Sequence, residues 1–170
     1  MPNRRLIIMR HASAAGGGSG SDHARPLTRI GNAEAARVGI RLAQLGALPD
    51  RVLSSSATRC RETFESLCIG MKIHPPVDFE DALYNAAHDE LLDQLASWFA
   101  AGENPGTLLL LAHNPGVSML AFDLGQGESG DETSLRSGFA PATFAVFEIE
   151  DDGPGISRRT ARLQHFERPA

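Results

Sequence analysis

The sequence predicts an α/β fold in three layers, with a mostly parallel central sheet, an antiparallel edge, and helices on both faces. Three observations carry this prediction. Short apolar segments that suit buried strands alternate with longer segments of helical periodicity. The segment 107–112 holds four consecutive leucines, which is typical of a strand covered on both faces. The last two apolar segments flank a short Asp-Asp-Gly-Pro turn at 151–154, which favours an antiparallel pair.

The first half of the chain is predicted to form two strands and two helices. The apolar run 6–9 is bounded by charges, which indicates a buried strand, and the glycine-rich residues 15–21 must be a loop. Apolar residues recur at helical spacing over 32–45, and the glycine that follows is placed to end this helix. A second strand core at 52–53 precedes a second helix over 57–68.

The middle of the chain contains a short strand and two further helices. Two adjacent prolines precede an extended segment at 77–79, and a third amphipathic helix is predicted over 91–99. After the four-leucine strand comes a helix over 117–124. Asn114 is a suitable cap for it, and Pro115 fits its first turn.

The C-terminal part is predicted to be a loop and two strands. Residues 125–138 are polar and glycine-rich, which indicates a mobile loop, and 143–149 and 159–166 suit the two strands. No internal repeat and no linker divides the chain. We therefore expect one domain over 1–170.

Composition excludes several classes of function. The chain has 16 basic and 21 acidic residues, so its formal net charge is −5, which is unfavourable for binding nucleic acid through its phosphates. No apolar run approaches the roughly 18 residues of a membrane span. The run 6–9 is too short for the core of a signal peptide. We therefore expect a cytoplasmic protein without a nucleic-acid or membrane partner.

The two cysteines exclude one catalytic class. In a protein that is not secreted, Cys60 and Cys68 are expected to be reduced and partly buried. Neither begins a Cys-x5-Arg loop, because Ser66 and His74 stand where the arginine is needed. A cysteine-based phosphatase is therefore excluded.

Polar side chains follow three of the predicted strands. Arg10-His11 follows the first, Arg59 opens the helix after the second, and His113 follows the four-leucine strand. Ligands bind beyond the carboxyl ends of strands in such sheets, so these side chains are expected to meet there. Two arginines can hold a phosphoryl group, one neutral imidazole can attack phosphorus, and the other can donate to a phosphoryl oxygen. The set predicts phosphoryl-transfer chemistry.

These residues belong to an ordered series of motifs: Leu6-Ile-Ile-Met-Arg-His11, Arg25-Pro-Leu-Thr28 with Gly31, Val52-Leu-Ser54 leading to Arg59-Cys-Arg-Glu-Thr63, Leu83-Tyr-Asn-Ala86, and Leu111-Ala-His-Asn-Pro-Gly116. The series resembles the histidine phosphatase superfamily related to phosphoglycerate mutases. It is most similar to the small bacterial phosphohistidine phosphatases that act on signalling proteins. The resemblance runs from Leu6 to about Ile149 and is specific as an ordered set.

The resemblance implies a phosphatase that works through a covalent phosphohistidine intermediate. It implies His11 as the nucleophile and Arg10, Arg59 and His113 as the phosphate pocket, with no metal and no organic cofactor. The implied substrate is phosphohistidine on a signalling or phosphotransfer protein. Small phosphate esters or phosphopeptides remain the alternative, and the oligomeric state is not predicted.

The sequence departs from the superfamily pattern at two positions. Ala12 stands where the family usually has glycine, and its methyl group could narrow the pocket floor. Asn85 stands where mutase-like members have a proton-donating glutamate. The small bacterial phosphatases instead place an aspartate three residues before the Arg-Pro-Leu-Thr stretch, and Asp22 has that spacing. We therefore expect Asp22 to be the proton donor and then the base that activates water.

Three further residues are candidates for substrate binding: Arg25, Asn85 and Asn114. Arg25 either adds a third positive charge to the pocket or forms a salt bridge that orders its loop. An imidazole leaving group, with a pKa of about 6.5, departs more easily than an alkoxide. A site with a weak acid therefore suits phosphohistidine better than a sugar phosphate.

Two other classes of function are less favoured. A metal-dependent hydrolase could use His11, Asp22, His23 and His113, but their spacing matches no familiar site and the neighbouring Arg10 would repel a cation. His23 is instead interpreted as a solvated loop residue. A catalytically inactive module that binds phosphorylated partners is disfavoured because all four core residues are present. Ser54 and Ser55 are interpreted as loop and cap residues because no Gly-x-Ser-x-Gly motif surrounds them.

Overall fold

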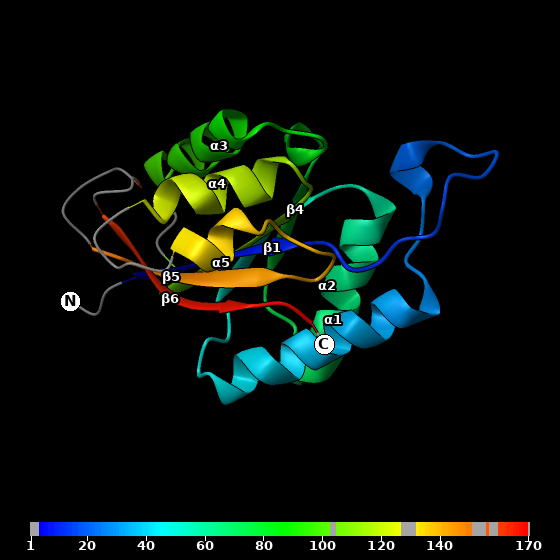
Figure 1. The fold of residues 1–170 in the computed structure, drawn as a ribbon, viewed down its shortest axis with the longest axis horizontal. Coiled ribbons are helices and arrows are strands. Elements are labelled where there is room, and N and C mark those ends of the chain that lie inside the picture. Colours follow the sequence, from blue (N-terminus) through cyan, green and yellow to red (C-terminus); the bar gives the residue numbers. More distant parts are fainter. Residues whose placement is uncertain (1–3, 103–104, 127–131, 151–155, 157–159, 170) are drawn as a thin grey trace.

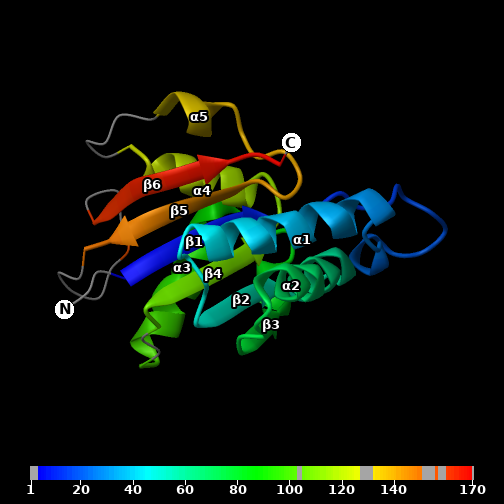
Figure 2. The ribbon, with the colours of Figure 1, turned by 90° about the horizontal axis from the view of Figure 1, so that it is seen from below.

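The computed structural model describes residues 4–102, 105–126, 132–150, 156 and 160–169. Its centre is a six-stranded sheet with strand order β3-β2-β4-β1-β5-β6, visible from β6 at the top to β3 at the bottom in Figure 2. The strands are β1 (Arg4–Arg10), β2 (Arg51–Ser55), β3 (Val77–Glu80), β4 (Thr107–Ala112), β5 (Phe144–Ile149) and β6 (Ala161–Glu167). Strands β1 to β4 pair in parallel, whereas β5 and β6 are antiparallel. The predicted fold class is confirmed.

Helices cover both faces of this sheet. One layer contains α1 (Arg29–Gln44) and α2 (Thr58–Met71), and the other contains α3 (His88–Ala100), α4 (Gly116–Leu124) and α5 (Glu132–Arg136). Figure 1 shows α3 and α4 above the sheet and α1 below it. Two short 3-10 helices, η1 (Asp22–Ala24) and η2 (Asp81–Leu83), lie in the connections. Within the described residues, no helix is both long and apolar enough to cross a membrane.

The leucines of β4 explain how the two layers share one sheet. Successive side chains of a strand point to opposite faces. Leu108 and Leu110 pack in the core beneath α3 and α4, while Leu109 and Leu111 pack in the core beneath α1 and α2. All four are at most 1% exposed. This confirms the prediction of a strand covered on both faces.

Two glycines bring backbone segments together around the carboxyl ends of the strands. A Cβ at Gly31, in the first turn of α1, would lie 2.0 Å from the carbonyl oxygen of Ser13. A Cβ at Gly116, at the start of α4, would lie 2.2 Å from the carbonyl oxygen of Ala86. Both contacts are too close for any side chain. Gly31 therefore holds α1 against the loop after β1, and Gly116 holds α4 against the segment after η2.

Several predicted boundaries are wrong. Helix α1 begins at Arg29 instead of 32, because Thr28 caps it by accepting a hydrogen bond from the Gly31 amide at 3.0 Å. Helix α3 begins at His88 instead of 91. The predicted loop 125–138 contains α5 over Glu132–Arg136, and its residues 127–131 lie outside the described part of the chain. The predicted turn at 151–154 also lies outside it.

The predicted capping of α4 is wrong as well. Pro115 is the N-cap residue of this helix, and no side chain caps it. The Asn114 side chain instead donates to the carbonyl oxygen of Phe139 at 2.7 Å. Asn114 therefore joins β4 to the loop after α5.

Candidate active site

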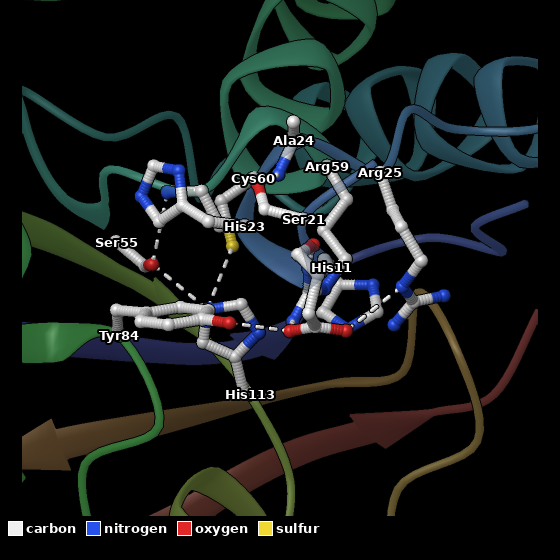
Figure 3. Close-up of polar contacts among 12 residues, drawn as sticks. His11, Ser21, His23, Ala24, Arg25, Ser55, Arg59, Cys60, Tyr84 and His113 are labelled. Atoms are coloured by element: carbon white, nitrogen blue, oxygen red, sulfur yellow. Dashed lines mark hydrogen bonds and ion pairs between the residues drawn. The ribbon is translucent and has the colours of Figure 1, made fainter. Parts of the chain in front are cut away.

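Three neighbouring strands bring the four core residues of the predicted site together. Arg10 ends β1 beside Ala112 of β4, so that His11 and His113, the next residues of each strand, lie side by side. Their ring centroids are 5.2 Å apart. Arg59 lies in the first turn of α2, which follows β2. Figure 3 shows His11, Arg59 and His113 converging at this edge of the sheet.

The His11 ring is held in one tautomer. Its Nδ1 lies 2.8 Å from the carbonyl oxygen of Ala12. Because a carbonyl only accepts hydrogen bonds, Nδ1 carries the hydrogen and Nε2 carries the lone pair. Burial lowers the pKa of His11 to about 4, and the positive charges of Arg10, Arg59 and Arg25 act in the same direction, against the bond to Ala12. At neutral pH, His11 is therefore an uncharged imidazole with a nucleophilic Nε2.

The His113 ring is held from the opposite side. Its Nε2 lies 2.8 Å from Ser55 Oγ and 3.7 Å from Cys60 Sγ. Its Nδ1 is buried and, among the described residues, has no hydrogen-bond partner. Burial, together with His11 and Arg59, lowers the pKa of His113 to about 3. The second histidine is therefore also neutral.

Two guanidinium groups, one half-buried on Arg10 and one buried on Arg59, supply the positive charge. Arg10 Nη1 donates to the carbonyl oxygen of Phe139 at 3.1 Å. Arg59 Nη1 donates to the carbonyl oxygen of Asp22 at 2.8 Å, and its Nη2 lies 3.2 Å from Asp22 Oδ2. In both arginines Nε is buried and lacks a partner in the described part of the chain. These two unpaired N–H groups belong to cations, and such charged donors suit an anion such as phosphate.

Asp22 lies at the entrance with its side chain 51% exposed. Its carboxylate accepts from the Tyr84 hydroxyl at 2.5 Å and from Arg25 Nε at 2.9 Å, in addition to Arg59. The hydrogen bonds from Tyr84 and Arg25 hold the pKa of Asp22 well below its ordinary value, with help from Arg59. In this arrangement Asp22 is a carboxylate that can accept a proton but has none to give.

Arg25 combines both of the roles considered for it. Its Nε pairs with Asp22, and its Nη1 donates to the carbonyl oxygen of Ala15 at 2.6 Å, so it orders the loop. Its charge also contributes to the lowered pKa of His11. Arg25 therefore acts electrostatically on the nucleophile while it ties the loop together.

Comparison with known proteins places this geometry in a family. The model of the histidine phosphatase superfamily (branch 1) matches residues 6–137. The chain belongs to this superfamily.

Similar proteins occur in plants and bacteria. An uncharacterized chloroplast protein of Arabidopsis thaliana is 38% identical over 122 residues, which cover 67% of this chain and 56% of that protein. Among solved structures, a candidate phosphohistidine phosphatase SixA from Agrobacterium tumefaciens is 30% identical, with a TM-score of 0.79 over 99% of both chains. Another from Nakamurella multipartitia is 32% identical, with a TM-score of 0.80 over 98% of this chain and 96% of that one.

The structure describes the surroundings of the two residues that depart from the superfamily pattern. Ala12 is fully buried among the core residues beneath α1 and α2, and its amide donates to Thr63 Oγ1 at 3.1 Å. Asn85 is exposed and has a positive φ of 56°, which asparagine tolerates better than most residues. Within the described residues, no hydrogen bond joins Asn85 to the four core residues. Asn114 was predicted to bind substrate. Its side-chain amide donates to the Phe139 carbonyl oxygen, which also accepts from Arg10.

Sequence reasoning missed Tyr84. Its ring packs edge-on against His113 and His23, with centroids 5.5 Å and 4.9 Å away, and the Arg59 guanidinium lies 5.8 Å from its centroid. One feature of the sequence pointed to Tyr84: it lies in the Leu83-Tyr-Asn-Ala motif, directly before Asn85, where other members of the family have a glutamate.

The interpretation of His23 as a solvated loop residue is wrong. Its Nε2 lies 2.9 Å from Ser56 Oγ, and the Ser56 hydroxyl in turn donates to Asp81. His23 thereby links η1 to the segment between β2 and α2. Among the described residues, no three His, Cys, Asp or Glu side chains are grouped as metal ligands.

Proposed function

We propose that this histidine phosphatase removes the phosphoryl group from phosphohistidine on a signalling or phosphotransfer protein, through a covalent intermediate on His11. The observation that carries the proposal is the state of the His11 ring. It is neutral, its Nδ1–H is tied to Ala12, and its Nε2 is left as the nucleophile near the half-buried Arg10 and the buried Arg59. A nucleophile of this kind splits one difficult displacement into two easier ones.

The first step transfers the phosphoryl group to the enzyme. His11 Nε2 forms a bond to phosphorus as the bond between phosphorus and the substrate imidazole breaks. Arg10 and Arg59 stabilise the charge on the transferring group, and His113 donates to one of its oxygens. The substrate imidazole leaves with a proton that it already carries or takes from water, because Asp22 is ionised.

The second step regenerates the enzyme. A water molecule attacks the phosphorus atom on His11, the bond from Nε2 to phosphorus breaks, and inorganic phosphate leaves. The ionised Asp22 is suited to accept the proton of this water. The carboxylate can then return its proton to solvent, since its side chain is half exposed.

The state of Asp22 favours phosphohistidine over sugar phosphates. An alkoxide leaving group needs a general acid, which contributes roughly 10²–10⁴ in rate. Asp22 is held ionised, and Asn85 cannot supply a proton. A protonated imidazole leaves without such help. The similarity to candidate phosphohistidine phosphatases of two bacteria supports the same assignment.

A substrate panel tests the proposal. A histidine-phosphorylated protein, a phosphotyrosine peptide and a phosphosugar are compared at matched concentrations, with His11→Ala as control. We expect the phosphohistidine protein to be hydrolysed fastest, with an acid-labile, base-stable phosphoenzyme and retained activity in EDTA. Equal turnover of the phosphosugar would contradict the substrate assignment. A missing phosphoenzyme with unchanged turnover in His11→Ala would contradict the mechanism.

A further inference from the structure

Two buried polar side chains, Ser55 and Cys60, lie behind the second histidine, His113. Ser55 and Cys60 are fully buried, and His113 is 3% exposed. Figure 3 shows Ser55 and Cys60 approaching the same nitrogen of the His113 ring, with Oγ at 2.8 Å and Sγ at 3.7 Å. The proposed chemistry uses His113 but assigns nothing to the two residues behind it.

The hydrogens of these groups can be assigned. Burial raises the pKa of the Cys60 thiol to about 12, so its S–H is intact at neutral pH and must be directed at an acceptor. The Ser55 oxygen accepts from the Ala57 amide at 3.2 Å, and its own hydrogen can turn toward an acceptor. Ser55 is also hydrogen-bonded to Cys60, and an unprotonated His113 Nε2 is the strongest acceptor within reach of both groups. A hydroxyl and a thiol thus face a nitrogen that accepts from them when it carries a lone pair.

We propose that Ser55 and Cys60 are positioning residues that fix the proton of neutral His113 on Nδ1, the nitrogen from which it donates to a phosphoryl oxygen. Nδ1 is buried and lacks a partner among the described residues. Phosphoryl oxygens offer only lone pairs, so the nitrogen that meets them must carry a hydrogen. The donation from Nδ1 to a phosphoryl oxygen rests on the proposed function, whereas the tautomer of His113 does not.

The opposite tautomer is disfavoured on both sides of the ring. A hydrogen on Nε2 would need the remaining lone pair of Ser55 Oγ, which already accepts from the Ala57 amide, and would turn the Ser55 and Cys60 hydrogens away from the ring. It would also leave a buried lone pair on Nδ1, which would repel the oxygens of any bound phosphate. The two histidines therefore share the Nδ1–H tautomer but are fixed at different nitrogens: His11 by an acceptor at Nδ1, and His113 by donors at Nε2.

The test is nitrogen-15 NMR of the histidine rings in the whole protein at neutral pH without substrate. His113→Asn identifies the His113 signals by their loss. We expect a protonated Nδ1 and an unprotonated Nε2 in the unaltered protein. Observation of the proton on Nε2 would overturn the proposal. The readout needs no activity, so it stays informative if the proposed substrate is wrong.

Variants then separate positioning from structure. Ser55→Ala is expected to give a mixture of His113 tautomers and a roughly tenfold lower kcat, as is typical when a supporting hydrogen bond is lost. Ser54→Ala is the matched control, because Ser54 is equally buried on the same strand but donates to the Ser55 carbonyl. It should leave the tautomer and kcat unchanged.

Cys60 offers a test of rescue. Cys60→Ala removes a donor and should shift the tautomer part of the way, whereas Cys60→Ser restores a donor and should return it. An unchanged His113 tautomer in both Ser55→Ala and Cys60→Ala would overturn the proposal. If the tautomer is as expected but no phosphoenzyme forms on His11, the proposed function fails and the positioning role stands.

Discussion

The floor and the rim of the site are built in different ways. The floor comprises the half-buried Arg10 and the buried residues His11, Ser55, Arg59, Cys60 and His113. The rim comprises Asp22, His23, Arg25 and Tyr84. Floor side chains bond to backbone carbonyls or to each other within the core, whereas the rim centres on a carboxylate that is half exposed. The floor is thus suited to bind the phosphoryl group and attack it, while the rim is suited to contact the leaving group and the attacking water.

Arg59 connects the two parts. Its side chain is 4% exposed, yet both of its terminal nitrogens bind Asp22 of the rim. Its Nε is left for an anion that enters the floor, while the other two nitrogens hold Asp22. This difference in burial and bonding gives an order of expected effects, from large at the floor to small at the rim.

The largest effect is expected at the nucleophile. His11→Ala removes the only nitrogen proposed to attack phosphorus, so we expect kcat/KM to fall by roughly 10⁴-fold or more, as in other enzymes that lose their nucleophile. Single-turnover assays with a labelled phosphohistidine protein measure the loss, and circular dichroism verifies folding. Residual activity within tenfold of the unaltered enzyme would show that the floor does not form the intermediate.

A smaller but still large effect is expected at Arg59. Arg59→Lys keeps the charge but cannot hold Asp22 with two nitrogens and present a third to phosphate. We expect kcat/KM to fall by roughly 10²–10³-fold, as for a lost transition-state donor. Arg61→Lys, on the exposed side of the same helix, is the matched control and should stay within a few-fold. Equal effects of the two substitutions would contradict the role of Arg59 at the floor.

The floor also predicts how stability depends on pH. Unfolded His11 takes up a proton near pH 6.5, whereas burial delays this to about pH 4 in the folded protein. Between these values the unfolded chain binds more protons, so stability decreases as the pH falls. We expect His11 alone to cost roughly 3 kcal/mol of unfolding free energy between pH 7 and pH 4, with a further loss from His113.

Urea unfolding at several pH values measures this dependence. His11→Gln should reduce the loss by about the His11 share. His74→Gln should leave it unchanged, because His74 is 60% exposed and pairs with Glu65 on the surface. A pH dependence that is identical in all three proteins would show that burial of His11 does not govern its protonation.

The sequence predicted Arg10, His11, Arg59 and His113 of the floor and Asp22 and Arg25 of the rim, but not the contacts that join the rim residues. Arg10, His11 and His113 follow apolar runs, and parallel strands bring such positions to one edge whatever the loops do. The Tyr84 contact with Asp22 spans 62 positions and depends on how η1 and η2 approach each other, which no local pattern encodes. The interpretation of Ser54 and Ser55 as loop and cap residues is wrong, because both lie in β2, and the contact of Ser55 with His113 was not predicted.

Asp22 is the rim residue with the larger expected effect. Asp22→Asn removes the base proposed for the second step but leaves the floor intact. We expect the phosphoenzyme to form at a nearly normal rate and to break down roughly 10- to 100-fold more slowly, so that it accumulates. Rapid-quench measurements separate the two steps. If formation slows and breakdown does not, Asp22 is the proton donor of the first step instead of the base of the second.

The smallest effect is expected from Tyr84→Phe, which removes a hydroxyl from the rim and keeps the ring against His113 and His23. Arg25 and Arg59 still bind Asp22, and the carboxylate is half exposed, so we expect phosphoenzyme breakdown to change less than about fivefold. Because the Tyr84 hydrogen bond is the largest cause of the lowered pKa of Asp22, its loss raises that pKa.

The pH profile of phosphoenzyme breakdown shows this shift. An ionised Asp22 is active above its pKa, so the acid limb of the profile should move to higher pH in Tyr84→Phe and disappear in Asp22→Asn. If Tyr84→Phe slowed breakdown as much as Asp22→Asn, the hydroxyl would be essential and the rim as rigid as the floor. If it moved no limb, Tyr84 would act through packing alone, and the state of Asp22 would depend on the two arginines.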